Sequence, residues 1–263
     1  MAKRGEIFRK ETKIRIISYL LDSRTASVSE LSEALEVSRV TISDLMDELV
    51  DARIVHKASE RSYSLLGEIA AVMLKLGISN AELVTVFFDC AEVKRTAMKL
   101  SPSMSYTDNA ARLLGIAEKY SAELKAQGKK VCCALICREE INSRTLPSAF
   151  SLFSSDPLIA SGVAEKCDGA VAYIDLADRF TCLSKNGTPI LRGRCPDDPA
   201  GDLCSALEIF KPDRVLISGA DASTRKVVAK ALATKKTELL FFRKEELYPD
   251  ERAALLALIE KRI

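Results

Sequence analysis

The chain has 263 residues, of which 48% are hydrophobic and 29% are charged. This composition excludes a disordered or fibrous chain, and at roughly 100–200 residues per domain the length allows one or two domains. The 39 lysines and arginines exceed the 37 aspartates and glutamates by only two, which excludes a histone-like polycation. Any nucleic acid must therefore be recognised by a local surface.

The sequence does not indicate a membrane-spanning or secreted protein. No apolar run approaches the roughly 18 residues of a membrane-spanning helix, and the first ten residues lack the basic-then-apolar pattern of a secretory signal. We therefore expect a cytoplasmic protein with free thiols and no membrane partner. The single histidine, His56, argues against a histidine-based metal centre or a Ser-His triad. No metal and no cofactor are predicted.

Residues 1–66 are predicted to form a winged helix-turn-helix DNA-binding domain. Apolar residues at helical spacing predict a helix over residues 11–22. Ser27 and Glu30 form a capping box that begins a second, short helix, and Ser38 is a good N-cap for a third helix over Arg39–Asp51. Two helices joined by so short a turn are typical of a helix-turn-helix. Two β-prone runs, Arg53–Lys57 and Arg61–Leu65, follow as a wing.

The candidate DNA contacts follow from this arrangement. Only the first turns of the second helix of a helix-turn-helix reach the bases, and a wing crosses the phosphate backbone. The predicted contacts are Ser38, Arg39, Val40, Thr41 and Ser43 on the helix, with Lys57 and Arg61 on the wing. Six of the eleven basic residues in 1–66 lie within the first fifteen, so a basic arm, Lys3–Arg15, is predicted to add attraction to DNA. An alternative interpretation is a fold used for protein contacts, because Asp44 and Asp47 lie on the exposed face and the domain has no net charge.

Residues 67–79 are predicted to be a linker, although their apolar sequence also suits a strand. Strands and helices alternate over residues 80–263. From residue 170 on they follow the order βββαβαβα, which is partly echoed in residues 83–137, and this indicates a duplicated mixed sheet. The predicted strands are 83–89, 93–100, 130–137, 170–176, 180–184, 188–191, 214–218 and 238–242, and the predicted helices are 107–128, 156–167, 199–210, 222–233 and 250–261. Alternation along 130–137 places Cys133 and Cys137 on one face and Cys132 on the other, so we expect buried thiols rather than a metal cluster.

The whole chain resembles the ROK family of repressors, open reading frames and sugar kinases. The resemblance is carried by Leu31–Val55, Ser154–Ala160, the predicted hairpin around Asn186–Gly193, and Val215–Gly219. It implies a winged helix joined to an actin-like, duplicated ribonuclease-H-type domain, in an overall α+β and α/β fold. It also implies a carbohydrate-like effector, for which Asp89, Asp156 and Gly219 are the candidate site.

The chain departs from the family where the kinases bind nucleotide, sugar and zinc. Neither Asp89–Glu92 nor Leu176–Phe180 has the glycines of the family's phosphate segments. The Glu-x-Gly-His sugar motif and the zinc cysteines are missing after Gly193. Asp156 aligns with the family's catalytic base, but its place before Pro157 also suits a helix N-cap. Glu36 and Arg53 stand where family-like patterns carry glycine, at a cost of roughly 1 kcal/mol each if the backbone is left-handed.

The sequence therefore predicts a DNA-binding transcriptional regulator, a repressor in the favoured hypothesis, that acts as a homodimer on double-stranded DNA. The second domain is predicted to serve dimerisation and small-molecule sensing without enzymatic activity. Two alternatives stay open: a ROK-type sugar kinase with a diverged site, and a protein-interaction module.

Overall fold

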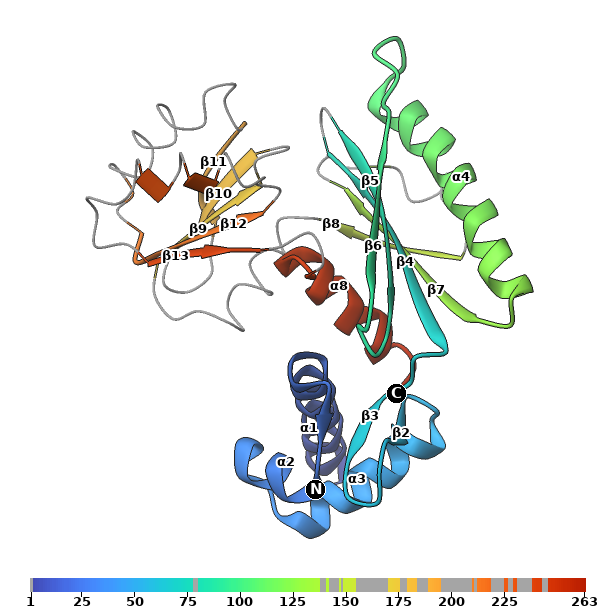
Figure 1. Ribbon diagram of the computed structural model, residues 1–263, viewed down its shortest axis with the longest axis vertical. Helices are drawn as coiled ribbons and strands as arrows, with labels where there is room; N and C mark the ends of the chain where they lie inside the picture. Colours follow the sequence, from blue (N-terminus) through green and yellow to red (C-terminus); the bar gives the residue numbers. More distant parts are fainter. Residues whose placement is uncertain are drawn as a thin grey trace.

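The computed structural model describes residues 2–77, 80–137, 149–154, 170–175, 179–183, 189–194, 212–218, 238–242 and 246–263, with residues 141, 147, 210, 225–226 and 229–230. It contains an N-terminal helical unit with a small sheet and two separate five-stranded sheets (Figure 1). None of the helices in these ranges is long and apolar enough to cross a membrane.

The N-terminal unit is a winged helix, as predicted. Its elements are α1 (Ala2–Ser23), β1 (Thr25–Ala26), α2 (Val28–Leu35), α3 (Arg39–Asp51), β2 (Val55–Lys57) and β3 (Tyr63–Leu65), with the strands in the order β1-β3-β2. The predicted capping box is present. The Glu30 amide donates to Ser27 Oγ (3.2 Å), and the Ser27 amide donates to Glu30 Oε2 (2.7 Å). Hydrogen bonding to the Ser27 backbone and hydroxyl lowers the pKa of Glu30.

The predicted basic arm is part of a helix, because α1 begins at Ala2 rather than at residue 11; its attraction to DNA stays a prediction. Arg9 and Lys13 both pair with Glu48 of α3, and Lys10 pairs with Glu260 near the C-terminus. The bonds from Lys13 and then Arg9 lower the pKa of Glu48. Two carboxylates thus pair with three of the six basic residues of Lys3–Arg15 and neutralise part of their charge.

The first large sheet begins within the predicted linker, and this corrects the range 67–79. Strand β4 (Ile69–Leu76) is its central strand, between β5 (Ala81–Phe87) and β7 (Lys130–Cys137), in the order β6-β5-β4-β7-β8. Strands β6 (Val93–Met98) and β8 (Phe150–Ser154) form its edges. A strand buried on both faces is apolar almost throughout, so it lacks the alternation that identifies most strands.

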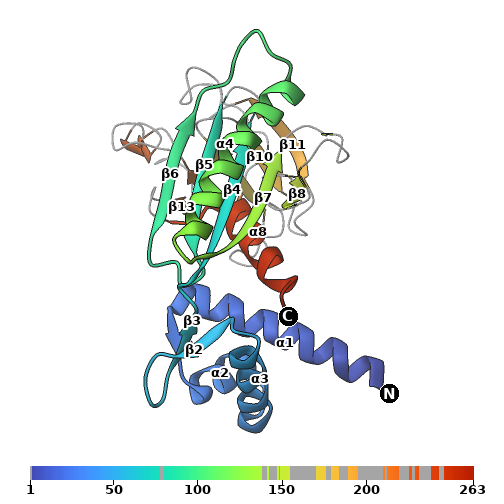
Figure 2. The same ribbon diagram turned by 90° about the vertical axis from the view of Figure 1, so that its right-hand side faces the viewer.

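Two helices cover the two faces of this sheet (Figures 1 and 2). On one face Ala70, Val72 and Leu74 of β4 pack with α4 (Tyr106–Ala126), which is N-capped by Ser105 rather than at Thr107. On the other face Ala71 and Met73 belong to the same apolar core as α8 (Pro249–Glu260) and α1. The winged helix is therefore packed on the first sheet and on α8 by a continuous core.

The second sheet repeats the topology of the first, which confirms the predicted duplication. Its order is β11-β10-β9-β12-β13, built from β9 (Val171–Asp175), β10 (Arg179–Leu183), β11 (Pro189–Arg194), β12 (Arg214–Ser218) and β13 (Glu238–Phe241). In each sheet three antiparallel strands are followed by two that run parallel to the first. The fold class predicted from the sequence is confirmed. The helix predicted over 156–167 lies outside the described residues, as does almost all of those over 199–210 and 222–233.

The three cysteines of β7 occupy the faces that alternation predicts. Cys133 and Cys137 are buried on the α4 face, while Cys132 lies on the opposite face beside Arg262. Burial raises the pKa of Cys137 to about 11, so its thiol stays protonated. In the described part of the chain no group of three or more histidine, cysteine or acidic side chains is placed to hold a metal ion.

Glu36 and Arg53 are in the left-handed conformation, each with φ of 55°. Since β-carbon crowding destabilises this conformation, we expect Glu36→Gly and Arg53→Gly each to stabilise the protein by about 1 kcal/mol. The measurement is thermal unfolding of the full chain. Glu33→Gly is the control, because Glu33 is an exposed residue inside α2 and glycine there should destabilise by about 1 kcal/mol. Destabilisation by all three changes would contradict the prediction.

Candidate nucleic-acid interface

The start of α3 is organised by its N-cap. Ser38 Oγ accepts a hydrogen bond from the Thr41 amide (3.2 Å) and lies 2.8 Å from Thr41 Oγ1. The two hydroxyls that are predicted DNA contacts are thus bonded to each other. Their first role is to begin the helix, although Ser38 is still exposed and can reach a phosphate.

Arg39 and Val40 project from the first turn of α3 into solvent. Val40 is 73% exposed, which is the largest exposure among the big apolar side chains of the described residues. The opposite face of α3 carries the fully buried Ile42, Leu45 and Leu49. Because an α-helix has 3.6 residues per turn, Val40 then lies on the solvent face. An exposed arginine beside an exposed aliphatic group suits recognition of a base edge and of a thymine methyl group.

The other side chains along α3 differ in their exposure to solvent. Ser43 is half-buried, while Asp44 and Asp47 are exposed further along α3. Because the acids begin one turn beyond Val40, they leave only the helix start suited to approach by a polyanion. The contact surface on α3 is therefore short.

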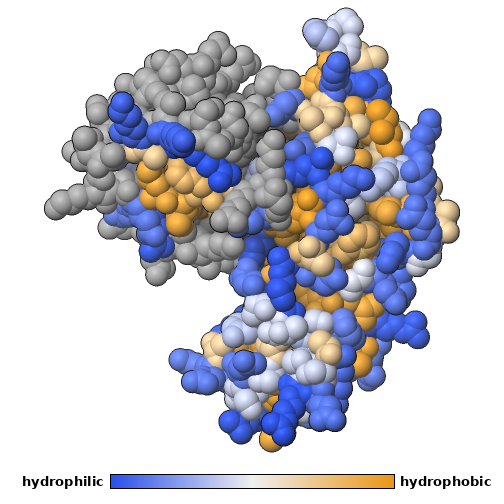
Figure 3. All heavy atoms as spheres, in the orientation of Figure 1, coloured by the Kyte–Doolittle hydropathy of each residue, from blue (hydrophilic) through white to orange (hydrophobic). Residues whose placement is uncertain are grey.

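The wing is a tight hairpin. In its turn the Ala58 amide donates to the Ser62 carbonyl (2.9 Å), and the hydroxyls of Ser59 and Ser62 are 2.6 Å apart. Lys57 at the end of β2 and Arg61 in the turn are both exposed. On the face seen in Figure 3, hydrophilic residues cover most of this N-terminal unit.

The predicted effector residues are only partly within the described structure. Asp89 lies in the turn after β5, where its carbonyl accepts a bond from Arg24 of the winged helix (2.9 Å). Its carboxylate is so close to Gly67 that a Cβ at that position would clash with Asp89 Oδ2. Asp156 and Gly219 lie outside the described residues, so their grouping with Asp89 stays a prediction.

The turn after the opening strand of the first sheet is one hairpin earlier than Asp89–Glu92. The strand that opens the sheet is β4, which is followed by Gly77, and Asp89 lies at the opposite end of this strand beside Gly67. If the resemblance to the family is followed along this strand, its Asp-x-Gly-Gly-Thr pattern would align with residues 75–79, where Lys75 stands at the aspartate and Ile78 at the second glycine. The duplication supports this assignment, because the β9–β10 turn is the equivalent position in the second sheet.

The sequence did not reveal that Lys75 belongs to a buried ionic cluster. Glu251 of α8 pairs with Lys75 (2.9 Å) and with Arg95 of β6 (2.6 Å), and it also accepts the Tyr248 amide (2.9 Å). The Arg95 guanidinium stacks 3.8 Å from the centroid of the Tyr248 ring. Burial opposes the charge of Glu251, but Lys75 and Arg95 lower its pKa to about 2. A lone lysine in an otherwise apolar strand was the signal available in the sequence.

Comparisons with known proteins agree with this geometry. Residues 10–57 match the family model of bacterial regulatory proteins of the arsR family, a helix-turn-helix family. No curated protein matches the chain in sequence. The structure resembles the crystal structure of a ROK family transcriptional regulator, described as a homologue of the E. coli MLC protein. The TM-score is 0.58 at 12% identity, over 96% of this chain and 98% of that one.

Two further structures are similar at lower scores. The ethanolamine utilization protein EutJ from Carboxydothermus hydrogenoformans has a TM-score of 0.48 and 12% identity, over 80% of this chain and 96% of its own. A ROK family protein from Streptococcus pneumoniae, solved in complex with sucrose, has a TM-score of 0.43 and 9% identity, over 73% of this chain and 98% of its own.

Together these observations define the fold. A helix-turn-helix of the regulatory-protein type is joined to a duplicated, actin-like domain. The structure shares its fold with a ROK family transcriptional regulator, and the resemblance predicted from the sequence is confirmed at the level of fold.

Proposed function

We propose that the protein is a transcriptional repressor that binds double-stranded DNA as a dimer through residues 1–66. The observation that carries the proposal is the exposed start of α3, where Arg39 and Val40 project beside each other from the helix that would enter the major groove. Lys57 and Arg61 supply the phosphate contacts of the wing. Asp44 and Asp47 restrict the contact to the first turn.

The dimer supplies the specificity that one short helix lacks. Two helices about one turn of DNA apart read two half-sites, and their binding free energies combine. The first turns of α1 offer a contact surface for a second copy, since Ile7 and Phe8 are about half exposed. In Figure 2 this end of α1 projects beyond α2 and α3.

The actin-like domain, residues 80–263 together with β4, serves assembly and sensing rather than phosphoryl transfer. Lys75 stands in place of the family's aspartate, and Glu251 and Asp250 neutralise it. A phosphate loop needs closely spaced amides and free positive charge, and residues 75–79 offer one glycine and a lysine already bound. The sugar kinase hypothesis loses support from this arrangement.

The test is fluorescence anisotropy of the full chain with DNA fragments from the promoters of its own gene neighbourhood. We expect binding that weakens steeply with salt, because phosphate contacts release counterions. Lys57→Ala and Arg61→Ala should each weaken binding on every fragment and reduce the salt slope by about 1 for each subunit that engages a phosphate through the replaced side chain. Lys119→Ala, on the exposed face of α4, is the matched control. Absence of binding to all fragments would favour a protein-interaction module instead.

A further inference from the structure

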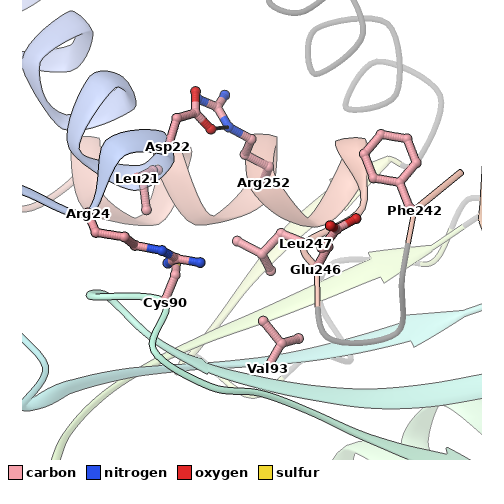
Figure 4. A pocket seen from close by; sticks show the side chains of 9 residues that line it. All are labelled: Leu21, Asp22, Arg24, Cys90, Val93, Phe242, Glu246, Leu247 and Arg252. Atoms are coloured by element: carbon pink, nitrogen blue, oxygen red, sulfur yellow. Dashed lines mark hydrogen bonds and ion pairs between the residues drawn. The ribbon is translucent and has the colours of Figure 1, made fainter. Parts of the chain in front are cut away.

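A pocket of about 240 Å³ lies where the winged helix, the first sheet and the C-terminal segment meet (Figure 4). Asp22 and Arg24 line it from the end of α1, Val93 from β6, and Glu246 and Arg252 from the C-terminal segment and α8. The pocket is smaller than those that hold drug-sized ligands, so it suits a small metabolite. Anything bound there contacts both the DNA-binding unit and the domain that carries it.

A cationic and an anionic side chain face each other across the pocket. Figure 4 shows the Arg24 side chain extending into it from one side, with Glu246 across from it and Leu247 and Val93 between them. Arg24 donates to the Asp89 carbonyl, and no carboxylate of the described residues lies within ion-pair distance of its guanidinium. Within the described structure, this cation therefore faces an acid across an apolar floor.

The second cation of the pocket links two elements. Arg252 of α8 pairs with Asp22 (2.9 Å) and donates to Ser18 Oγ (2.7 Å), both on α1. The Arg252 side chain is buried, whereas that of Asp22 is 56% exposed. Asp22 binds Arg252 through both carboxylate oxygens, and because Asp22 is exposed, water can solvate its carboxylate when a competing anion takes its place.

The backbone on both walls is strained. Arg24 has φ of 69° and Cys90 has φ of 51°, and both residues line the pocket. Left-handed residues other than glycine are unfavourable and cluster at binding and switch sites. The strain is a second observation, independent of the charges, that marks this junction.

We propose that this pocket is the effector site and that it binds a small hydroxy acid of sugar-acid size. The carboxylate pairs with Arg24 and Arg252, the hydroxyl groups donate to Glu246, and the carbon chain lies on Val93 and Leu247. A dianionic phosphate fits less well, because Glu246 and Asp22 also face the pocket. Binding displaces Asp22 from Arg252, removes this link between the end of α1 and α8, and lowers DNA affinity, because two half-sites need a fixed spacing.

The regulatory part of this inference rests on the proposed function, so ligand binding is measured without DNA. Isothermal titration of the full chain uses gluconate and glucuronate as probes, with glucose and glucose 6-phosphate for comparison. We expect the two acids to bind and glucose to bind at least tenfold more weakly. Arg24→Gly removes the guanidinium and relieves the left-handed strain, so this variant should stay folded yet bind the acids at least tenfold more weakly. Glu246→Gln should weaken the acids less.

Arg53→Gly is the matched control, because it makes the same replacement at a left-handed position away from the pocket. The proposal is overturned if neither acid binds, if Arg24→Gly binds them as the unaltered protein does, or if glucose or glucose 6-phosphate binds more tightly. With promoter DNA, a saturating acid should raise the Kd for DNA at least fivefold. Acid binding in a protein that binds no DNA would count against the proposed function and leave the pocket assignment supported.

Discussion

Glu251→Gln should destabilise the protein by about 3–5 kcal/mol, because it leaves Lys75 and Arg95 buried without their shared counter-ion. Glu251 is fully buried, and the exposed fractions of the Lys75 and Arg95 side chains are only 13% and 6%. Glutamine keeps the shape of the glutamate side chain, so the loss of stability measures the contribution of the charge of Glu251. Thermal and urea unfolding of the full chain would detect a change that is a large part of a typical stability of about 5–15 kcal/mol.

Glu260→Gln is the matched control for this change. Glu260 also pairs with a lysine, Lys10, but both side chains are largely exposed, and such pairs contribute about 0–1 kcal/mol. Equal effects of the two substitutions would contradict the assignment of Glu251 as the centre of a buried cluster.

The cluster also predicts a dependence of stability on pH. The pKa of Glu251 is lowered to about 2 in the folded protein, against about 4.3 in an unfolded chain. A carboxyl group with a lowered pKa contributes stability above its unfolded pKa and loses it as the pH falls toward the folded value. We therefore expect the free-energy difference between the unaltered protein and Glu251→Gln to be constant near neutral pH and to shrink between about pH 5 and pH 2.

Val40→Asp should reduce the affinity for DNA by at least thirtyfold. The substitution removes the exposed apolar group from the first turn of α3 and places a carboxylate beside phosphates and bases. The loss of one good base contact costs about 1–3 kcal/mol, and a dimer loses two. Anisotropy titrations with the same promoter fragment would measure the effect.

Val50→Asp controls for the effect of an added acid on the helix itself. Val50 is 37% exposed near the far end of α3, beyond the turns that reach the bases. We expect this variant to bind DNA within a few-fold of the unaltered protein. If both variants bind equally well, the start of α3 is not the recognition surface.

Local sequence signals determined the N-terminal unit. The capping box at Ser27, the N-cap at Ser38 and the apolar period of α3 predict elements that the structure contains within a few residues. Each of these signals acts within one or two helical turns, so no distant partner is needed to interpret it. The resemblance also predicted the left-handed turns at Glu36 and Arg53, because it places glycine at these two positions.

The sequence by itself could not decide which charges are free and which are paired. The basic residues of Lys3–Arg15 suggested an arm for DNA, but two of them, Arg9 and Lys13, share an ion pair with Glu48, far along the chain. The sequence of residues 67–79 suits either a strand or a linker. The structure decides for a strand, because β5 and β7 lie on the two sides of β4. The Glu251 cluster and the pocket beside Arg24 join residues more than 150 positions apart. A local sequence pattern determines a helix because the hydrogen bonds of the helix are local. Ion pairs and pockets depend instead on which elements the core brings together, and only the tertiary structure decides this arrangement.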